Sequence, residues 1–103
     1  MQEIYNKQWT DFEVQALAYS ILRKNLYPTY LVRGDYKFNA CRVGIAVFKA
    51  HKDKEPELMV IVQIKKNMSQ ADQYSKILGV PTVYIRGGDE AYNIVSLVQP
   101  YLS

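Results

Sequence analysis

The run Val60–Lys66 constrains the fold most, because it passes from apolar to alternating polar side chains within a single short stretch. The residues Leu58–Val62 are continuously apolar, which is typical of a β-strand that is covered on both faces. Side chains alternate along a strand, so Gln63 and Lys65 are expected to point to the same face. An amide beside an ammonium group at the end of a buried strand indicates a candidate site.

The first helix is expected to begin around Thr10 and to end near Asn25. Thr10 and Glu13 have the spacing of a capping box, and the apolar residues that follow recur at helical intervals. Shorter helices are predicted after the N-cap candidates Ser69 and Asp89, ending near Leu78 and Val98. Gly79 follows the first of these helices, at the position of a left-handed C-cap. Strands are predicted at Thr29–Arg33, at Arg42–Phe48 (or from nearer Tyr36), at Leu58–Lys65 and at Pro81–Ile85.

This order predicts an α/β fold, α-β-β-β-α-β(-α), with a central mixed four-stranded sheet flanked by helices. The charged stretch 51–56 is expected to be the turn of a hairpin, so the first three strands would form a meander. The helix before the fourth strand would be a crossover, which makes the third and fourth strands parallel. A length of 103 residues predicts one domain, residues 1–103.

Composition excludes several classes of site. A single cysteine, Cys41, and a single histidine, His51, cannot supply an internal disulfide, a cysteine-based zinc site or a histidine-ligated metal site. The formal net charge of +3 permits nucleic-acid binding without showing it. The sequence has no apolar signal core and no run long enough to span a membrane, so we expect a soluble, cytoplasmic protein.

The order of elements resembles the PD-(D/E)xK, or restriction-endonuclease-like, superfamily. Glu13 falls at the helix carboxylate of that family, Gln63-Ile64-Lys65 at its (D/E)-x-K pair, and Gln70 and Tyr74 at its Gln-x-x-x-Tyr pattern. The segment Arg42-Val43-Gly44-Ile45-Ala46 is similar to the family's second-strand segment, with Gly44 at the position of its Asp.

The resemblance implies Mg²⁺-dependent hydrolysis of phosphodiester bonds. In that scheme Lys65 and Glu13 carry most of the catalytic site, and Glu13 and Gln63 are the metal ligands. The resemblance further implies that the nucleic acid, expected to be DNA, is bound by four side chains: Gln70, Tyr74, Lys66 and Arg42.

Two of the three family carboxylates are replaced in this chain. Gln63 keeps an oxygen but loses the negative charge, and Gly44 has no side-chain ligand at all. Asp35, at the expected start of the second strand, and Asp72, on the crossover helix, are candidate replacements. We interpret the pattern as a variant or degenerate form of a nuclease site.

Each motif also has a structural interpretation. Glu13 can simply complete the capping box of Thr10, and Lys65 can be a solvated residue at a strand end. The scattered cations Arg33, Lys37, Arg42 and Lys49 can form a solvated face, and the tyrosines can be packing residues. Gly87 and Gly88 can offer amides to an anion or form a plain turn.

The leading hypothesis is a small endonuclease-like protein, either active or degenerate. The alternative is a non-catalytic nucleic-acid-binding protein on the same fold, and a third interpretation is a subunit of an assembly. The sequence leaves the possibility of a homodimer undecided, because no stretch identifies an interface.

Overall fold

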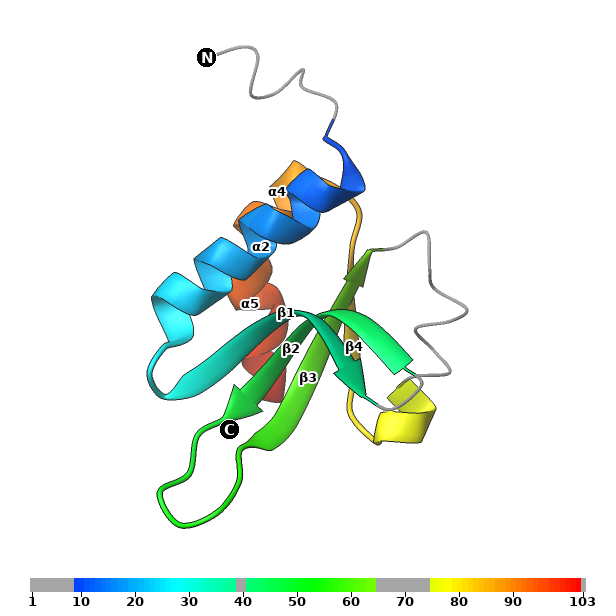
Figure 1. Ribbon diagram of the computed structural model, residues 1–103. Coiled ribbons are helices and arrows are strands. Elements are labelled where there is room, and N and C mark those ends of the chain that lie inside the picture. The colour runs from blue at the N-terminus through cyan, green and yellow to red at the C-terminus, as the bar shows by residue number, and fades with distance from the viewer. Residues whose placement is uncertain (1–8, 39–40, 65–74, 103) are drawn as a thin grey trace.

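The central feature of the computed structural model is one mixed β-sheet with the strand order β1-β2-β3-β4 (Figure 1). Residues 9–38, 41–64 and 75–102 are described. The strands are β1 (Tyr30–Phe38), β2 (Cys41–Lys49), β3 (Glu57–Ile64) and β4 (Thr82–Ile85). The helices are α2 (Asp11–Leu26), α4 (Gly88–Tyr92), α5 (Ile94–Val98) and the 3₁₀ helix η2 (Gln99–Tyr101). Residues 75–78 are also helical.

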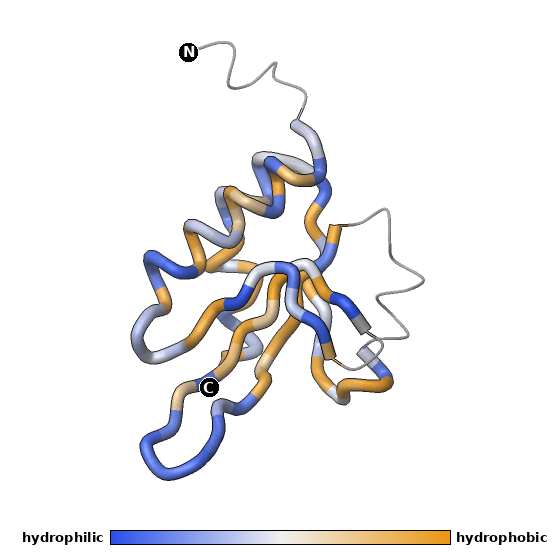
Figure 2. Tube along the Cα trace, viewed as in Figure 1, coloured by the Kyte–Doolittle hydropathy of each residue, from blue (hydrophilic) through white to orange (hydrophobic). Residues whose placement is uncertain are grey.

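The strand directions confirm the predicted topology. β1, β2 and β3 pair antiparallel as a meander, and β3 pairs parallel with β4. Figure 2 shows apolar strands and a hydrophilic loop between β2 and β3, as expected for a hairpin turn. The fold is therefore α/β, with a mixed four-stranded sheet flanked by helices. No helix in the described ranges has both the length and the apolar character that a membrane crossing requires.

Helix α2 begins with the capping box that the sequence predicts. The side chain of Thr10 accepts a hydrogen bond from the N–H of Glu13, and the Glu13 side chain bonds back to the N–H of Thr10. Val14, Ala18 and Leu22 recur at helical spacing and are buried. The helix runs one residue past the predicted stop at Asn25, whose side-chain amide donates to the carbonyl of Ile21.

Strand β1 is longer than predicted, and Asp35 lies inside it rather than at the start of the second strand. Gly34 was expected to end the strand because glycine often marks a turn. In the structure the strand continues through Gly34, and a Cβ at this position would be in ordinary van der Waals contact with the ring of Tyr19, at 3.4 Å. Asp35 has a positive φ of 49°, and the strand bends there and continues to Phe38.

Two hydrophobic clusters lie on the two faces of the sheet. The larger cluster packs beneath α2, α4 and α5 and includes Leu22, Ile45, Val62 and Ile94. The smaller cluster contains Val43, Ala46 and Ile61, with Leu58, Leu78, Val80 and the rings of Tyr36, Phe38 and Phe48 packed around it.

Strand β2 contributes to both clusters in a way that a regular strand would not. Val43 and Ile45 are two residues apart and should share a face, yet they belong to different clusters. The strand must therefore turn between them, at Gly44, across the sheet from the irregular Asp35. The bend carries the end of the β1–β2 hairpin over the smaller cluster, as the arched hairpin in Figure 1 shows.

The C-terminal part of the chain confirms one predicted cap and corrects another. Gly79 has a φ of +70°, and its N–H donates to the carbonyl of Ser75, as expected for a left-handed C-cap. The prediction of a single last helix is wrong in detail, because this segment forms two short helices, α4 and α5, which join at Asn93. Its N-cap is Gly87, so Asp89 lies inside the first turn and is not the cap.

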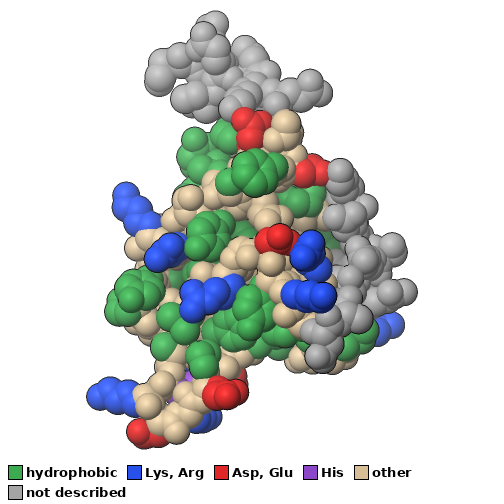
Figure 3. Space-filling view, viewed as in Figure 1, with side chains coloured by type: hydrophobic (Ala, Val, Ile, Leu, Met, Phe, Trp, Pro, Cys, Tyr) green, Lys and Arg blue, Asp and Glu red, His purple; other side chains and the backbone are tan. Residues whose placement is uncertain are grey.

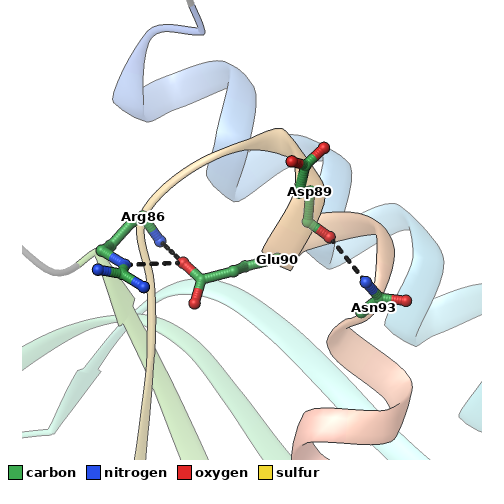
Figure 4. A network of polar contacts seen from close by, with 4 residues as sticks. All are labelled: Arg86, Asp89, Glu90 and Asn93. Carbon is green, nitrogen blue, oxygen red and sulfur yellow. Dashed lines mark hydrogen bonds and ion pairs between the residues drawn. The ribbon is translucent and has the colours of Figure 1, made fainter. Parts of the chain in front are cut away.

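A polar network explains where α4 begins and ends (Figure 4). The carboxylate of Glu90 accepts the backbone N–H of Arg86 at 2.6 Å and also the Nε of its guanidinium group at 3.3 Å. At the other end, the amide of Asn93 donates to the carbonyl of Asp89 at 3.2 Å. These contacts fix the short helix without a side-chain cap.

Candidate functional site

Gly44 and Gln63 face each other across β2 and β3. The antiparallel register runs from Lys49↔Glu57 to Ile45↔Val62, and these two residues stand one step beyond it. Gln63 is a buried polar residue with an exposed fraction of 6%, and its Oε1 accepts a hydrogen bond of 2.6 Å from the N–H of Gly44. The amide side chain therefore satisfies a backbone donor at the point where β2 bends.

The space beside Gly44 is occupied by Gln15 from α2. A Cβ at position 44 would lie 2.8 Å from the Oε1 of Gln15, 3.0 Å from the carbonyl oxygen of Val62 and 3.1 Å from the Oε1 of Gln63. Two amide oxygens and a backbone carbonyl thus converge on this glycine. An aspartate here would have to displace at least one of them, and it would add negative charge among oxygens that already carry partial negative charge.

Sequence analysis missed Gln15, since it belongs to no motif. The available signal was its position on the helix: Gln15, Ala18 and Leu22 are spaced i, i+3 and i+7 and so lie on one side. A polar residue at the margin of a buried helix face often reaches a partner on the neighbouring sheet. That spacing alone did not point to Gly44, which is far away in the sequence.

Glu13 is held at the N-terminus of its own helix. Its Oε1 accepts a hydrogen bond from the backbone N–H of Thr10 at 3.0 Å and another from the hydroxyl of Thr10 at 3.1 Å. Successive residues of a helix are about 100° apart, so Glu13 and Gln15 point to different sides. Gln15, rather than Glu13, is the helix residue that reaches Gly44. The structural interpretation of Glu13 as part of a capping box is confirmed.

Of the two candidate replacements for the missing Asp, the structure describes Asp35 and not Asp72. Asp35 is exposed and lies 3.6 Å from the guanidinium of Arg42, with both side chains 68% exposed. Ion pairs as exposed as this one contribute little to stability, about 0 to 1 kcal/mol. Asp72 lies outside the described residues, as do Lys65, Lys66, Gln70 and Tyr74.

These donors do not fit a magnesium site within the described ranges. Mg²⁺ prefers several oxygen ligands, among them carboxylates. Residues 9–38, 41–64 and 75–102 hold no group of three or more Asp, Glu, His or Cys side chains that could share an ion. The Oε1 of Gln63 already accepts a hydrogen bond from the N–H of Gly44, and the Oε1 of Glu13 accepts one from the N–H of Thr10.

The turn at Gly87 and Gly88 is filled by an aromatic side chain. A Cβ at Gly88 would lie 2.5 Å from the indole nitrogen of Trp9, so only glycine allows this approach. The Trp9 ring also meets Tyr92 edge-on, with ring centroids 6.5 Å apart. The geometry favours a plain strand-to-helix turn over a site for an anion.

Positive side chains are exposed along the bent hairpin. Arg33, Lys37 and Arg42 are all exposed, on β1 and on the first part of β2. Figure 3 shows Lys and Arg side chains gathered across the middle of one face, over α2 and the β1–β2 hairpin, beside scattered hydrophobic side chains. No protein-family model matches the chain, and neither a curated protein nor a solved structure shows significant similarity to it.

Proposed function

We propose that this protein is a non-catalytic nucleic-acid-binding protein on a restriction-endonuclease-like fold, with a metal site that has degenerated. The observation that carries the proposal is the pairing of Gly44 with Gln63 on adjacent strands. In the superfamily that the sequence resembles, these two positions hold the Asp and the Asp or Glu of the catalytic site. Here both charges are gone, and the remaining amide serves a backbone N–H.

The exposed cations support the binding part of the proposal. Arg33, Lys37 and Arg42 stand on the hairpin beside the degenerate site, and Asp35 is the acidic residue that pairs with one of them. Cations on one surface attract the phosphate backbone, and this attraction is independent of sequence and sensitive to salt. Binding of this kind requires neither a metal ion nor a catalytic carboxylate.

The test is a binding and cleavage assay on the same samples. Fluorescence anisotropy with labelled single-stranded and duplex oligonucleotides should show binding that weakens as salt rises from about 50 to about 200 mM. Chelation by EDTA should leave the affinity unchanged, and incubation with Mg²⁺ or Mn²⁺ should leave the oligonucleotides intact. Metal-dependent cleavage that Lys65→Ala abolishes would show an active nuclease. No binding at low salt would refute the proposed function.

Restoring the family carboxylates provides a sharper version of the test. The double variant Gly44→Asp/Gln63→Glu is crowded by Gln15, so the triple variant with Gln15→Ala is the better design. Isothermal titration with Mg²⁺ should detect no binding to the wild-type protein and binding to the triple variant. Lys65→Ala in the triple variant is the matched control, because it removes the family lysine and keeps both restored carboxylates.

A further inference from the structure

A shallow hollow lies on the C-terminal half of α2, away from Gly44 and Gln63. It has a volume of about 450 Å³ and is lined by Tyr19, Ser20, Arg23, Lys24 and Tyr27. Tyr19 and Arg23 are spaced i and i+4 on one side of the helix, and Tyr27 is its C-cap residue. The lining combines two cations, two phenol rings and a hydroxyl group, with no carboxylate among these residues. We call this the α2 hollow.

The side chains of the α2 hollow differ in how firmly they are held. The Tyr19 ring packs against Gly34 of β1, and its hydroxyl lies 3.5 Å from an Nη of Arg23. Tyr27 is 61% exposed, which is a large apolar surface to leave in water. Arg23 and Lys24 are exposed in the last turn of the helix, where the helix dipole favours cations. One ring is thus fixed, and the second ring and both cations remain accessible.

A second, smaller hollow also has a cation beside aromatic rings. Its volume is about 160 Å³, and its lining includes Arg33, Tyr36 and Phe48. The α2 hollow is lined by residues of α2 and its C-cap, whereas the smaller hollow is lined by residues of β1, β2 and the loop before β3. Figure 3 shows one face of the molecule, on which positive and hydrophobic side chains are interspersed.

We infer that the α2 hollow binds one nucleotide unit of a single-stranded nucleic acid, with Tyr27 stacking on a base and Arg23 and Lys24 contacting the flanking phosphates. Cations and aromatic rings side by side are the combination that single-strand-binding proteins use. An unpaired base offers a face for the ring, whereas the bases of a duplex are already stacked on one another. The inference rests on the proposed nucleic-acid binding.

The test compares two ligands of equal length and equal charge. Labelled oligo-dT carries bases, and an abasic oligonucleotide carries the same phosphates without them. Tyr27→Ala should weaken binding of oligo-dT about tenfold, because a stacked base is worth roughly that factor or more. It should leave binding of the abasic strand unchanged. Tyr27→Phe keeps the ring and should bind oligo-dT as the wild type does, and Tyr101→Ala is the control for loss of an exposed tyrosine elsewhere.

The charge contribution is tested with a matched pair of double variants. Arg23→Gln/Lys24→Gln should weaken binding of both strands and lower the slope of log affinity against log salt by about 1.4, since each phosphate contact on a single strand contributes about 0.7. Lys52→Gln/Lys54→Gln removes the same charge from the β2–β3 loop, outside both hollows, and should change the slope less. Thermal unfolding by circular dichroism checks that each variant is folded.

The outcomes separate the α2 hollow from the proposed function. If the wild type binds, and the variants in the α2 hollow lower the affinity no more than the control variants do, the α2 hollow is not the binding site. The proposed function would still hold in that case. Equal binding of both strands, with no effect of Tyr27→Ala, would overturn the stacking role and identify a general polyanion surface, such as one for an acidic peptide. Failure of the wild type to bind either strand would overturn the proposed function and the hollow together.

Discussion

The two faces of the sheet are covered in different ways. The face toward α2, α4 and α5 is packed by helices, and its cluster includes the fully buried Leu22 and Ile94. The opposite face is covered by the end of its own β1–β2 hairpin, through the half-buried rings of Tyr36 and Phe38, together with Leu78 and Val80 before β4. The first arrangement follows from amphipathic helices, and the second depends on a bend at Asp35 and Gly44. The comparison shows that a bent hairpin contributes to the cover of a face on which α2, α4 and α5 do not pack.

The largest effects on the free energy of unfolding should appear when a packed side chain is removed from each face of the sheet. Leu22→Ala should lower the free energy of unfolding by about 3–4 kcal/mol, because it leaves a cavity in the closely packed helix-covered cluster. Phe38→Ala should cost less, about 2 kcal/mol, since this ring is half-buried and its neighbours can relax. Urea unfolding followed by circular dichroism measures both. An equal loss at Phe38 would show that the two faces are packed equally firmly.

Gly44 tests the bend between the two faces. Gly44→Asp should lower the free energy of unfolding by about 3 kcal/mol, because its Cβ would crowd Gln15, Gln63 and the backbone oxygen of Val62 and its charge would be partly buried. Adding Gln15→Ala should recover about 1 kcal/mol, since residues in contact are energetically coupled. The four proteins of this double-mutant cycle are compared by urea unfolding. Strict additivity would mean that Gln15 does not fill the space at Gly44.

Gln63 tests how the bend is held. Gln63→Leu keeps the size of the side chain and removes the acceptor for the Gly44 N–H, so it should cost about 2 kcal/mol as a buried donor loses its partner. Gly44 should then show faster amide hydrogen exchange by NMR. Gln63→Glu is the matched control for the hydrogen bond, because a carboxylate still accepts from that N–H and should keep the exchange slow. Slow exchange in Gln63→Leu would contradict a role for Gln63 at the bend.

The local features of the fold were predictable from the sequence. The Thr10–Glu13 capping box, the left-handed Gly79 and the hairpin at 51–56 each depend on residues within a few positions of one another. The parallel pairing of β3 and β4 also followed, because a helical crossover imposes that direction. Features that depend on residues close together in the sequence can be predicted from it, because the interacting residues can be read directly.

The bend and the amide cluster were not predictable in this way. Gly34 and Asp35 have the composition of a turn, yet β1 continues through both residues, with a positive φ at Asp35. Gln15, Gly44 and Gln63 come from three elements and meet through the register of the sheet. The similarity to a nuclease motif identified Gly44 and Gln63 as a candidate pair, and it gave no indication that the side chain of Gln15 lies beside Gly44.

The capping box provides the smallest effect and separates the two interpretations of Glu13. Thr10→Ala should lower the free energy of unfolding by about 1 kcal/mol, because it removes the acceptor for the Glu13 N–H. Glu13→Gln should cost less than about 0.5 kcal/mol, since glutamine also serves at this position of a capping box. Thermal unfolding of the two variants, measured beside the wild type, tests this order. If Glu13 acts only in the cap, Glu13→Gln should also leave oligonucleotide affinity unchanged with and without Mg²⁺. A metal-dependent loss of affinity in Glu13→Gln would instead show that this carboxylate takes part in a metal site. The helix-covered side of the sheet would then have a binding role in addition to its packing role.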